Sequence, residues 1–326
     1  MVARKLATGA VALAAIVALG VPAAPAQAAA RYPVGNAATG YATLLVDPEA
    51  NPPGVNVCSC RPSAAHPRPI VLVPGTTSKV IASWSALGPI LANLGYCVYG
   101  LNYGATWLTT LSGGRIGAVG DIPSAAAELA TFVDRVLSAT ATSKVDIVGW
   151  SQGGMMPRYY LKNLGGASKV ARLVGLASSN HGTTVDGLNT LLNGAGALAG
   201  FPLTSFIGCP ACTQQVLPSA FISNLNAGGD TLAGIDYSVI ETRYDEVVTP
   251  YTSAFLAGAR NILLQDQCPA DITDHLGISY DSNALQDVVN LLGPADPSFR
   301  PVCGLALPLI GSPQPAATSQ SPVRMR

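Results

Sequence analysis

The segment VDIVGWSQGGM at residues 145–155 constrains the fold of this chain more than any other stretch. Its first four residues are apolar apart from Asp146 and predict a short buried strand. Ser151 follows, with Gly149 and Gly153 two residues away on either side. A serine held at positive φ between a strand and a helix needs small neighbours at these positions. The pattern G-x-S-x-G therefore predicts a sharp turn that carries a nucleophile, followed by a helix whose positive end faces the reacting group.

A proline lies in this predicted helix. Pro157 comes about one and a half turns after Gln152, at a depth where proline normally costs ~3 kcal/mol. We therefore expect the helix to begin late or to kink at this residue.

Strand and helix patterns alternate along the rest of the chain. Strands are predicted at residues 69–74, 97–101, 170–177, 237–242 and 261–264, and helices at 84–94 and 121–138. This alternation, without a repeat, predicts an α/β domain with a mostly parallel, doubly wound sheet flanked by helices. The proline-rich segment 31–68 is expected to be extended on the surface. Residues 184–229 are equally consistent with a lid or acyl pocket and with ordinary packed helices.

A reactive serine needs a base that accepts its proton and an acid that orients the base. His275 follows the last predicted strand, which is the position expected for the base, and Asp245 follows the strand at 237–242. His181 is the alternative base, whereas His66 is expected on the surface. Glu246, Asp271 and Asp274 are the other acids near these positions. We expect Glu246 to point elsewhere, and Asp271 and Asp274 to form hydrogen bonds within the loop. The backbone N–H of Gln152 and Thr76 are the predicted donors to an oxyanion.

The sequence pieces that carry this site also resemble a known family. They are LVPGT at 72–76, LGY at 94–96, WSQGG at 150–154, SKV at 168–170, NAGG at 226–229, DE at 245–246 and DH at 274–275. Together they resemble the Candida antarctica lipase B-like lipases and the related secreted actinobacterial lipases of the α/β-hydrolase superfamily.

The resemblance implies an α/β-hydrolase fold and a triacylglycerol lipase or esterase that uses no cofactor. It implies the roles given above for Ser151, Asp245 and His275, and for Thr76 and Gln152 as oxyanion donors. It further implies that Cys97 pairs with Cys58 or Cys60, with the count back from Pro74 favouring Cys58, and that Cys268 pairs with Cys303. The chain departs from the family pattern at Ser179, where the family has an acid.

Seven cysteines in a secreted chain predict disulfides with one cysteine left over. Cys209 and Cys212 are expected to close a small structural loop rather than to form a redox motif. No cysteine has a zinc spacing with the histidines, so no metal site is expected. The formal net charge is zero and no basic stripe occurs, so nucleic acid is not an expected partner.

The first 28 residues have the features of a secretory signal peptide. Arg4 and Lys5 precede an apolar stretch at residues 6–21, and a small-residue cleavage site ends at Ala28. We therefore expect an extracellular mature chain with no permanent membrane anchor, a single catalytic domain at residues 29–311 and a disordered tail at 312–326. A monomer is expected.

The function predicted from these features is that of a secreted, serine-dependent carboxylic ester hydrolase. A triacylglycerol lipase that acts on lipid or ester substrates at an oil–water interface is the specific prediction. An acyltransferase or a polyester hydrolase would use the same three residues. A non-catalytic secreted binding protein and a serine peptidase are less favoured, the first because the residues of the site are intact.

Overall fold

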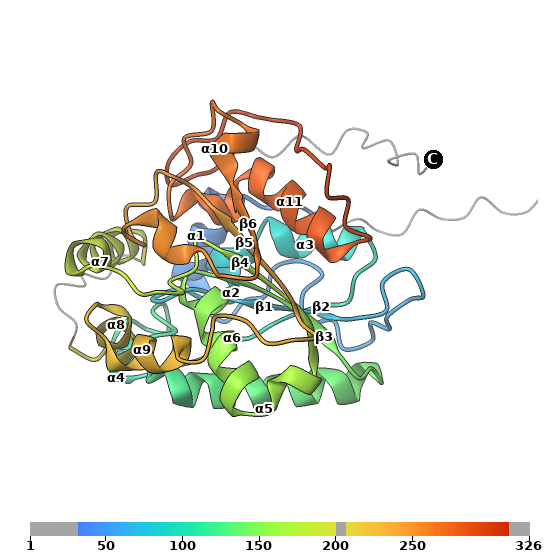
Figure 1. The fold of residues 1–326 in the computed structure, drawn as a ribbon, viewed down its shortest axis with the longest axis horizontal. Helices are drawn as coiled ribbons and strands as arrows, with labels where there is room; N and C mark the ends of the chain where they lie inside the picture. The colour runs from blue at the N-terminus through green and yellow to red at the C-terminus, as the bar shows by residue number, and fades with distance from the viewer. Residues whose placement is uncertain (1–31, 200–206, 313–326) are drawn as a thin grey trace, which may run out of the picture. The chain divides into compact units, whose positions relative to one another are not determined.

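A six-stranded parallel sheet runs through the part of the chain that the computed structural model describes, residues 32–199 and 207–312 (Figure 1). Its order is β2-β1-β3-β4-β5-β6, and every neighbouring pair is parallel. The strands are β1 (Ile70–Val73), β2 (Val98–Gly100), β3 (Val145–Trp150), β4 (Val170–Leu176), β5 (Asp236–Glu241) and β6 (Arg260–Leu263). The predicted fold class, a mostly parallel doubly wound sheet, is confirmed.

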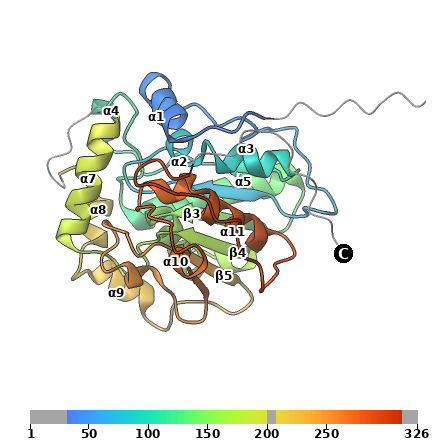
Figure 2. The ribbon, with the colours of Figure 1, turned by 90° about the horizontal axis from the view of Figure 1, so that it is seen from above.

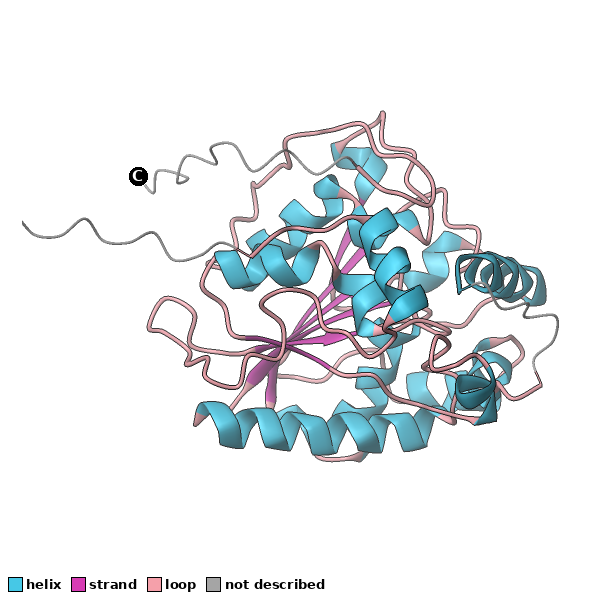
Figure 3. Cartoon of the chain, turned by 180° about the vertical axis from the view of Figure 1, so that it is seen from behind, coloured by secondary structure: helices cyan, strands magenta, loops and turns pink. Residues whose placement is uncertain are grey.

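Helices cover both faces of the sheet (Figure 3). One face carries α5 (Ile122–Thr140) and α6 (Gln152–Asn163), and the other carries α2 (Val80–Trp84), α3 (Leu87–Asn93) and α11 (Ser282–Leu292). Because both faces are covered, the central strands β1 and β3 are buried at every residue. This burial explains why their sequences are almost continuously apolar.

The segment after β4 forms helices at one end of the sheet. These are α7 (Val185–Ala199), α8 (Pro210–Gln215) and α9 (Ala220–Asn226), which lie on the same side of the domain in Figures 1 and 2. The short α4 (Trp107–Leu111) is joined to the segment before α8 by a hydrogen bond from the Thr106 hydroxyl to the Gly208 carbonyl. The sequence did not predict α4. The remaining elements are α1 (Ala37–Val46), α10 (Leu264–Gln267) and three 3-10 helices at Gly166–Ser168, Tyr251–Ala254 and Gly277–Tyr280.

The expectation of an extended segment before β1 was wrong over residues 37–46, which form α1. Asn36 caps this helix: its side chain accepts from the Thr39 N–H, while the Thr39 hydroxyl accepts from the Asn36 N–H. This capping box satisfies two of the donors that a helix start leaves free. Leu44 is buried, so α1 packs against the body of the domain.

The single helix expected at 84–94 and the expected late start of the helix after Ser151 were also wrong, whereas the alternative of a kink at Pro157 stays a prediction. The predicted helix at 84–94 is two helices, because Trp84 ends α2 and α3 begins at Leu87. Pro89 thereby falls in the first turn of α3, where its missing N–H costs nothing. In contrast, α6 does not start late. It begins directly after Ser151 and includes Pro157. This proline has no N–H, so the carbonyl of Gly153 in the first turn lacks its intrahelical hydrogen bond.

The disulfide near the amino end joins Cys60 to Cys97, so the preference for Cys58 was wrong. Asn56 explains the choice: its backbone N–H donates to Val98 and its side chain pairs with the backbone of Gly100, which fixes this stretch along β2. The turn that follows carries Cys60 back to the sheet and leaves Cys58 exposed and free. The structure also contains Cys209–Cys212 and Cys268–Cys303 disulfides.

Loss of the Cys60–Cys97 disulfide should lower the stability measurably. In a Cys58→Ser background, where no alternative pairing exists, Cys60→Ser should reduce the free energy of unfolding by about 2–4 kcal/mol, because the open chain gains entropy. Cys58→Ser alone should change it by less than about 0.5 kcal/mol. Urea unfolding without reductant measures both. An equal loss in the two variants would contradict the assigned pairing.

The predicted signal peptide and most of the predicted tail lie outside the described residues. The expectations for residues 1–28 and 313–326 therefore stay predictions. Among the helices of the described ranges, none has the length and apolar character needed to cross a bilayer.

Candidate active site

Ser151 lies between β3 and α6 in a strained backbone conformation. Its φ is 57° and its ψ is −126°, a backbone conformation that residues other than glycine rarely adopt. The residue is almost fully buried, and its N–H donates to the carbonyl of Leu176 on the neighbouring strand. The turn thus holds the serine at the carboxyl end of the sheet, where ligands meet α/β proteins.

Three glycines make this turn sterically feasible. A Cβ on Gly149 would lie 1.9 Å from the carbonyl oxygen of Gly153, and a Cβ on Gly153 would lie 2.2 Å from that of Val73. A Cβ on Gly75 would approach the Cβ of Ser151 to 2.9 Å. The backbone around Ser151 is therefore too close-packed for any larger residue at these positions.

His275 and Asp245 form a buried pair. His275 Nδ1 lies 2.8 Å from Asp245 Oδ2, and neither side chain is exposed. Asp245 Oδ1 accepts from the N–H groups of Val247 and Val248, which fixes the carboxylate. His275 Nε2 is buried and has no hydrogen-bond partner among the described residues. The imidazole therefore keeps one nitrogen free for a group in the site.

Trp150 also helps to orient the imidazole. This residue precedes Ser151 and donates from its indole Nε1 to the carbonyl of His275 at 2.9 Å. Its ring lies 5.4 Å from the imidazole, centroid to centroid, with the two planes tilted by 43°. The neighbour of Ser151 is thereby held against His275, although no hydrogen bond joins Ser151 to His275 within the described ranges.

The electrostatic surroundings raise the pKa of His275. Burial alone lowers this pKa, but the negative charges of Asp245, Glu246 and Asp274 outweigh burial. The expectation that Glu246 points elsewhere was wrong, because its Oε2 accepts from the backbone N–H of His275. Glu246 is half-buried, and this burial raises the pKa of its carboxyl group. The environment thus favours an imidazolium, the form that a histidine takes when it accepts a proton.

The two predicted oxyanion donors lie side by side. Thr76 Oγ1 donates to the side chain of Gln152 at 2.8 Å, and both residues are buried. Gln152 is the first residue of α6, so its N–H has no intrahelical partner. Neither this N–H nor that of Thr76 bonds to another described residue. The amino end of α6 adds a positive dipole to the same place.

Sequence reasoning missed Gln215, which links these donors. Its Nε2 donates to Thr76 Oγ1 at 2.9 Å and to Gln152 Oε1 at 3.0 Å, and its Oε1 accepts from Ser179 Oγ at 2.7 Å. Gln215 is the last residue of α8 and is buried. Ser179 stands where the related family has an acid, and this departure was the one signal in the sequence that a hydrogen-bonding partner lay nearby.

Two of the three histidines have other partners. His181, the alternative base, bonds to Asp230 and to the Ser253 carbonyl, and His66 packs against Tyr96. Asp274 precedes His275 in the chain and accepts from the backbone N–H groups of Gly277 and Leu309, which is the loop hydrogen bonding expected of it.

A small cavity lies beside the turn that carries Ser151. Its volume is about 20 Å³, enough for roughly one water molecule. The lining is mostly apolar and comes from α1, α7, the end of β3 and the loops that carry Thr77 and Leu276: Tyr41, Leu44, Thr77, Ser78, Trp150, Leu191 and Leu276. An acyl chain can enter here only if side chains of this lining move apart.

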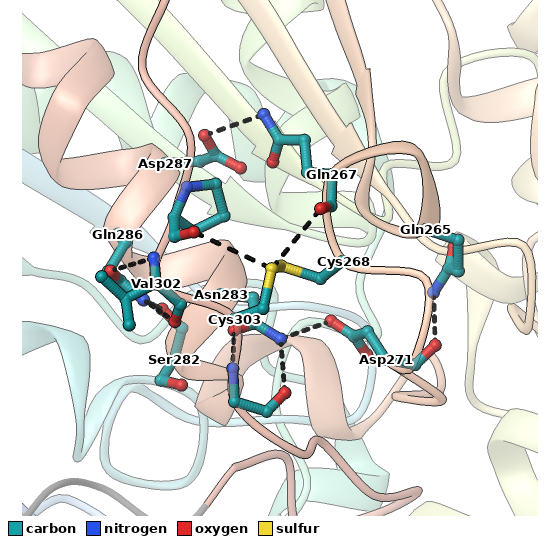
Figure 4. Close-up of a disulfide and its surroundings, with 12 residues drawn as sticks. Gln265, Gln267, Cys268, Asp271, Ser282, Asn283, Gln286, Asp287, Val302 and Cys303 are labelled. Atoms are coloured by element: carbon teal, nitrogen blue, oxygen red, sulfur yellow. Dashed lines mark hydrogen bonds between the residues drawn. A yellow bond between two sulfur atoms is a disulfide. The ribbon is translucent and has the colours of Figure 1, made fainter.

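A pair of buried carboxyl groups braces the loop that carries His275. Asp271 accepts from Asn283 Nδ2, which also donates to the Gly304 carbonyl (Figure 4). Asp281 caps α11 and accepts from the Asn283 N–H and the Ser312 hydroxyl. Burial and a hydrogen bond with Asp271 raise the pKa of Asp281 to about 8. The two acids therefore share a proton at neutral pH.

This shared proton makes the stability pH-dependent. The folded chain keeps the proton of Asp281 up to about pH 8, whereas the unfolded chain loses it near pH 4, so stability falls as the pH rises between these values. Asp281→Asn keeps the helix cap and removes this slope. Urea midpoints from pH 5 to 9 should rise for Asp281→Asn relative to wild type until about pH 8. Parallel curves, as expected for the exposed control Asp47→Asn, would contradict the shared proton.

Within the described ranges, no group of three or more acidic, histidine or cysteine side chains is arranged to hold a metal ion.

The chain is similar to known proteins in sequence and in fold. Residues 67–286 match the family described as Lipase (class 2). The crystal structure of Aspergillus fumigatus lipase B is 24% identical, with a TM-score of 0.56, over 72% of this chain and 55% of that chain. The mature form of Bacillus licheniformis lipase BlEst2 is 17% identical, with a TM-score of 0.50, over 71% of this chain and 94% of that chain. At these identities the structures establish the fold alone, which is that of the α/β-hydrolases.

Proposed function

The chain belongs to the class 2 lipase family of carboxylic ester hydrolases, and from this premise we propose that it is a secreted esterase with a serine nucleophile, specifically a triacylglycerol lipase. The observation that carries the proposal is the buried His275–Asp245 pair, 2.8 Å apart, whose imidazole leaves Nε2 free. Ser151, on a strained turn between β3 and α6, is the nucleophile.

In the proposed reaction, Ser151 Oγ attacks the ester carbonyl carbon while its proton passes to His275 Nε2. Asp245 accepts from Nδ1 and stabilises the imidazolium that forms. The carbonyl oxygen becomes an oxyanion, which the N–H groups of Gln152 and Thr76 and the Thr76 hydroxyl stabilise. The imidazolium then gives its proton to the departing alkoxide. Water resolves the acyl-enzyme by the same steps, with His275 again as the base.

Gln215 has a defined part in this scheme. The Thr76 hydroxyl donates to Gln152 Oε1 in the free enzyme and has to turn toward the oxyanion during the reaction. Gln215 Nε2 already donates to Gln152 Oε1, so that oxygen keeps a partner when the hydroxyl turns. Ser179 donates to Gln215 Oε1 and thereby fixes which end of the amide faces Thr76.

Replacing Gln215 should therefore slow the chemical step. Gln215→Leu is expected to lower kcat about tenfold with little change in KM, because the lost hydrogen bonds support the transition state. The adjacent Gln214→Leu is a matched control, since the side chain of Gln214 bonds, among the described residues, to the Asp121 side chain and the Ile122 N–H at the start of α5. Steady-state kinetics on p-nitrophenyl butyrate test both. An unchanged kcat in Gln215→Leu would exclude the assigned role.

The proposal of a lipid substrate rests on the apolar lining of the small cavity beside the turn at Ser151, where Leu44, Leu191 and Leu276 are buried. Secretion rests on the signal-like first 28 residues and is compatible with three disulfides. We accordingly take residues 29–311 as the catalytic domain, with the substrate as its only assigned partner.

Initial rates on p-nitrophenyl butyrate and on emulsified triolein test the proposal. Hydrolysis of both by the wild type would support a lipase, and hydrolysis of the soluble ester alone would reduce the proposal to an esterase. If folded wild-type protein cleaves neither, and a serine-reactive phosphonate does not label Ser151, the hydrolase proposal fails. Product analysis with added alcohol distinguishes an acyltransferase.

A further inference from the structure

The carboxyl group of Glu241 acts on Asp245 of the His275–Asp245 pair and has no part in the scheme above. Glu241 is the last residue of β5 and is completely buried. Its Oε1 accepts from the N–H of the next residue, Thr242, at 2.7 Å. Its Oε2 is also buried, and no N–H or O–H group of the described residues donates a hydrogen bond to it. One oxygen of this carboxyl group is therefore without a donor.

The surroundings of Glu241 contain negative charge and no compensating cation. The acids that act on it are Asp245 and Glu246, and His275 lies beyond Asp245 and is already paired with it. None of the ion pairs within residues 32–199 and 207–312 includes Glu241. A buried carboxyl group without a cation avoids the cost of an isolated charge by keeping its proton. Burial first, and then Asp245, raise the pKa of Glu241 well above its usual value.

A protonated carboxyl group is a hydrogen-bond donor and needs an acceptor. Asp245 is the first of the acids that act on Glu241, and its side chain lies within reach of that of Glu241. Asp245 already accepts from His275 and from the backbone of Val247 and Val248, and a carboxylate has about four acceptor positions. The O–H of Glu241 fits the remaining one.

We propose that Glu241 is a positioning residue that stays protonated in the folded enzyme and donates a hydrogen bond to Asp245, extending the His275–Asp245 pair by one neutral carboxyl group. The role deepens the proposed function and rests on it, because Asp245 matters for catalysis only if His275 is the base. Glu241 holds the carboxylate in place without adding a second negative charge next to it.

The protonation state can be tested without any activity. Glu241→Gln keeps the acceptor for Thr242 and supplies an amide donor to Asp245, but it cannot ionise. The folded wild type holds a proton that the unfolded chain loses near pH 4.3, so its stability should fall with rising pH relative to Glu241→Gln. Urea midpoints from pH 5 to 9 should therefore diverge, whereas the exposed control Glu128→Gln should run parallel to wild type. Parallel curves for Glu241→Gln would overturn the proposal.

Kinetics then test the positioning role. If Glu241 is neutral, the acid limb of the pH profile of kcat/KM should coincide in wild type and Glu241→Gln, because no charge near His275 has changed. Glu241→Leu, which lacks the donor, should lower kcat about tenfold per active site titrated with a phosphonate, with KM unchanged. A shift of the acid limb to lower pH in Glu241→Gln, or an unchanged kcat in Glu241→Leu, would overturn the proposal.

The two experiments separate the two levels of the argument. If no ester is cleaved but the unfolding curves diverge, the proposed function fails while the proton on Glu241 stands. If esters are cleaved and the curves run parallel, the proposed function stands and the role of Glu241 fails.

Discussion

Replacing Ser151 by alanine is expected to lower kcat/KM for p-nitrophenyl butyrate by at least about 10⁴-fold. The reason is that no other hydroxyl group lies on the strained turn between β3 and α6, so the variant has no group to form the acyl-enzyme. The residual rate should come from the oxyanion donors at Thr76 and Gln152. Initial rates at enzyme concentrations up to the micromolar range measure a loss of this size.

The loss has to be separated from misfolding and from trace wild-type enzyme. Ser168→Ala, which removes an exposed serine from the 3-10 helix before β4, is the matched control and should keep the wild-type rate. Urea unfolding of Ser151→Ala should match that of wild type, because only one oxygen is removed. Activity above about one per cent of wild type, with no phosphonate-reactive site, would mean that Ser151 is not the nucleophile.

The largest effect on folding is expected for Gly149→Ala. The added Cβ would lie 1.9 Å from the carbonyl oxygen and 2.2 Å from the carbonyl carbon of Gly153. Both are backbone atoms in the first turn of α6, and the turn at Ser151 fixes their position. The clash can be relieved only by separating β3 from α6, so we expect a loss above about 4 kcal/mol and little soluble protein.

A glycine with open surroundings provides the control for this prediction. Gly293 follows α11, has a negative φ, and its nearest atom to an added Cβ lies at 3.6 Å. Gly293→Ala should therefore change the free energy of unfolding by no more than about 0.5 kcal/mol. Soluble yield and urea midpoints compare the two variants. A Gly149→Ala protein as stable as Gly293→Ala would contradict the described turn.

Several features of this protein are determined by short stretches of sequence. The G-x-S-x-G pattern around Ser151 requires small residues within two positions of the serine, and this requirement is local. The alternation of apolar strands and amphipathic helices likewise predicts a parallel sheet, since each strand must return to the same edge. Placing Asp245 and His275 after the last two strands followed from the same rule, because successive parallel strands end at one edge.

Other features depend on residues that are distant in sequence. Asn56 on the edge of β2 decides that Cys60, and not Cys58, meets Cys97. Gln215 lies 139 residues from Thr76, and no local pattern marks a glutamine at the end of a six-residue helix as a partner. Each of these choices depends on which side chains the tertiary structure brings within hydrogen-bond distance.

Glu241 illustrates the physical reason for this division. In the sequence it lies within the strand predicted at 237–242, and no pattern there singles it out. Its burial and its closeness to Asp245 arise only when β5 is enclosed by its neighbours in the sheet and by the loop that carries His275. The sequence by itself determined the order of strands, the turn and its serine through steric and periodic rules. The tertiary structure decided the disulfide partner, the hydrogen bonds of Gln215 and the surroundings of Glu241, because dielectric environment and hydrogen-bond partners belong to the assembled fold.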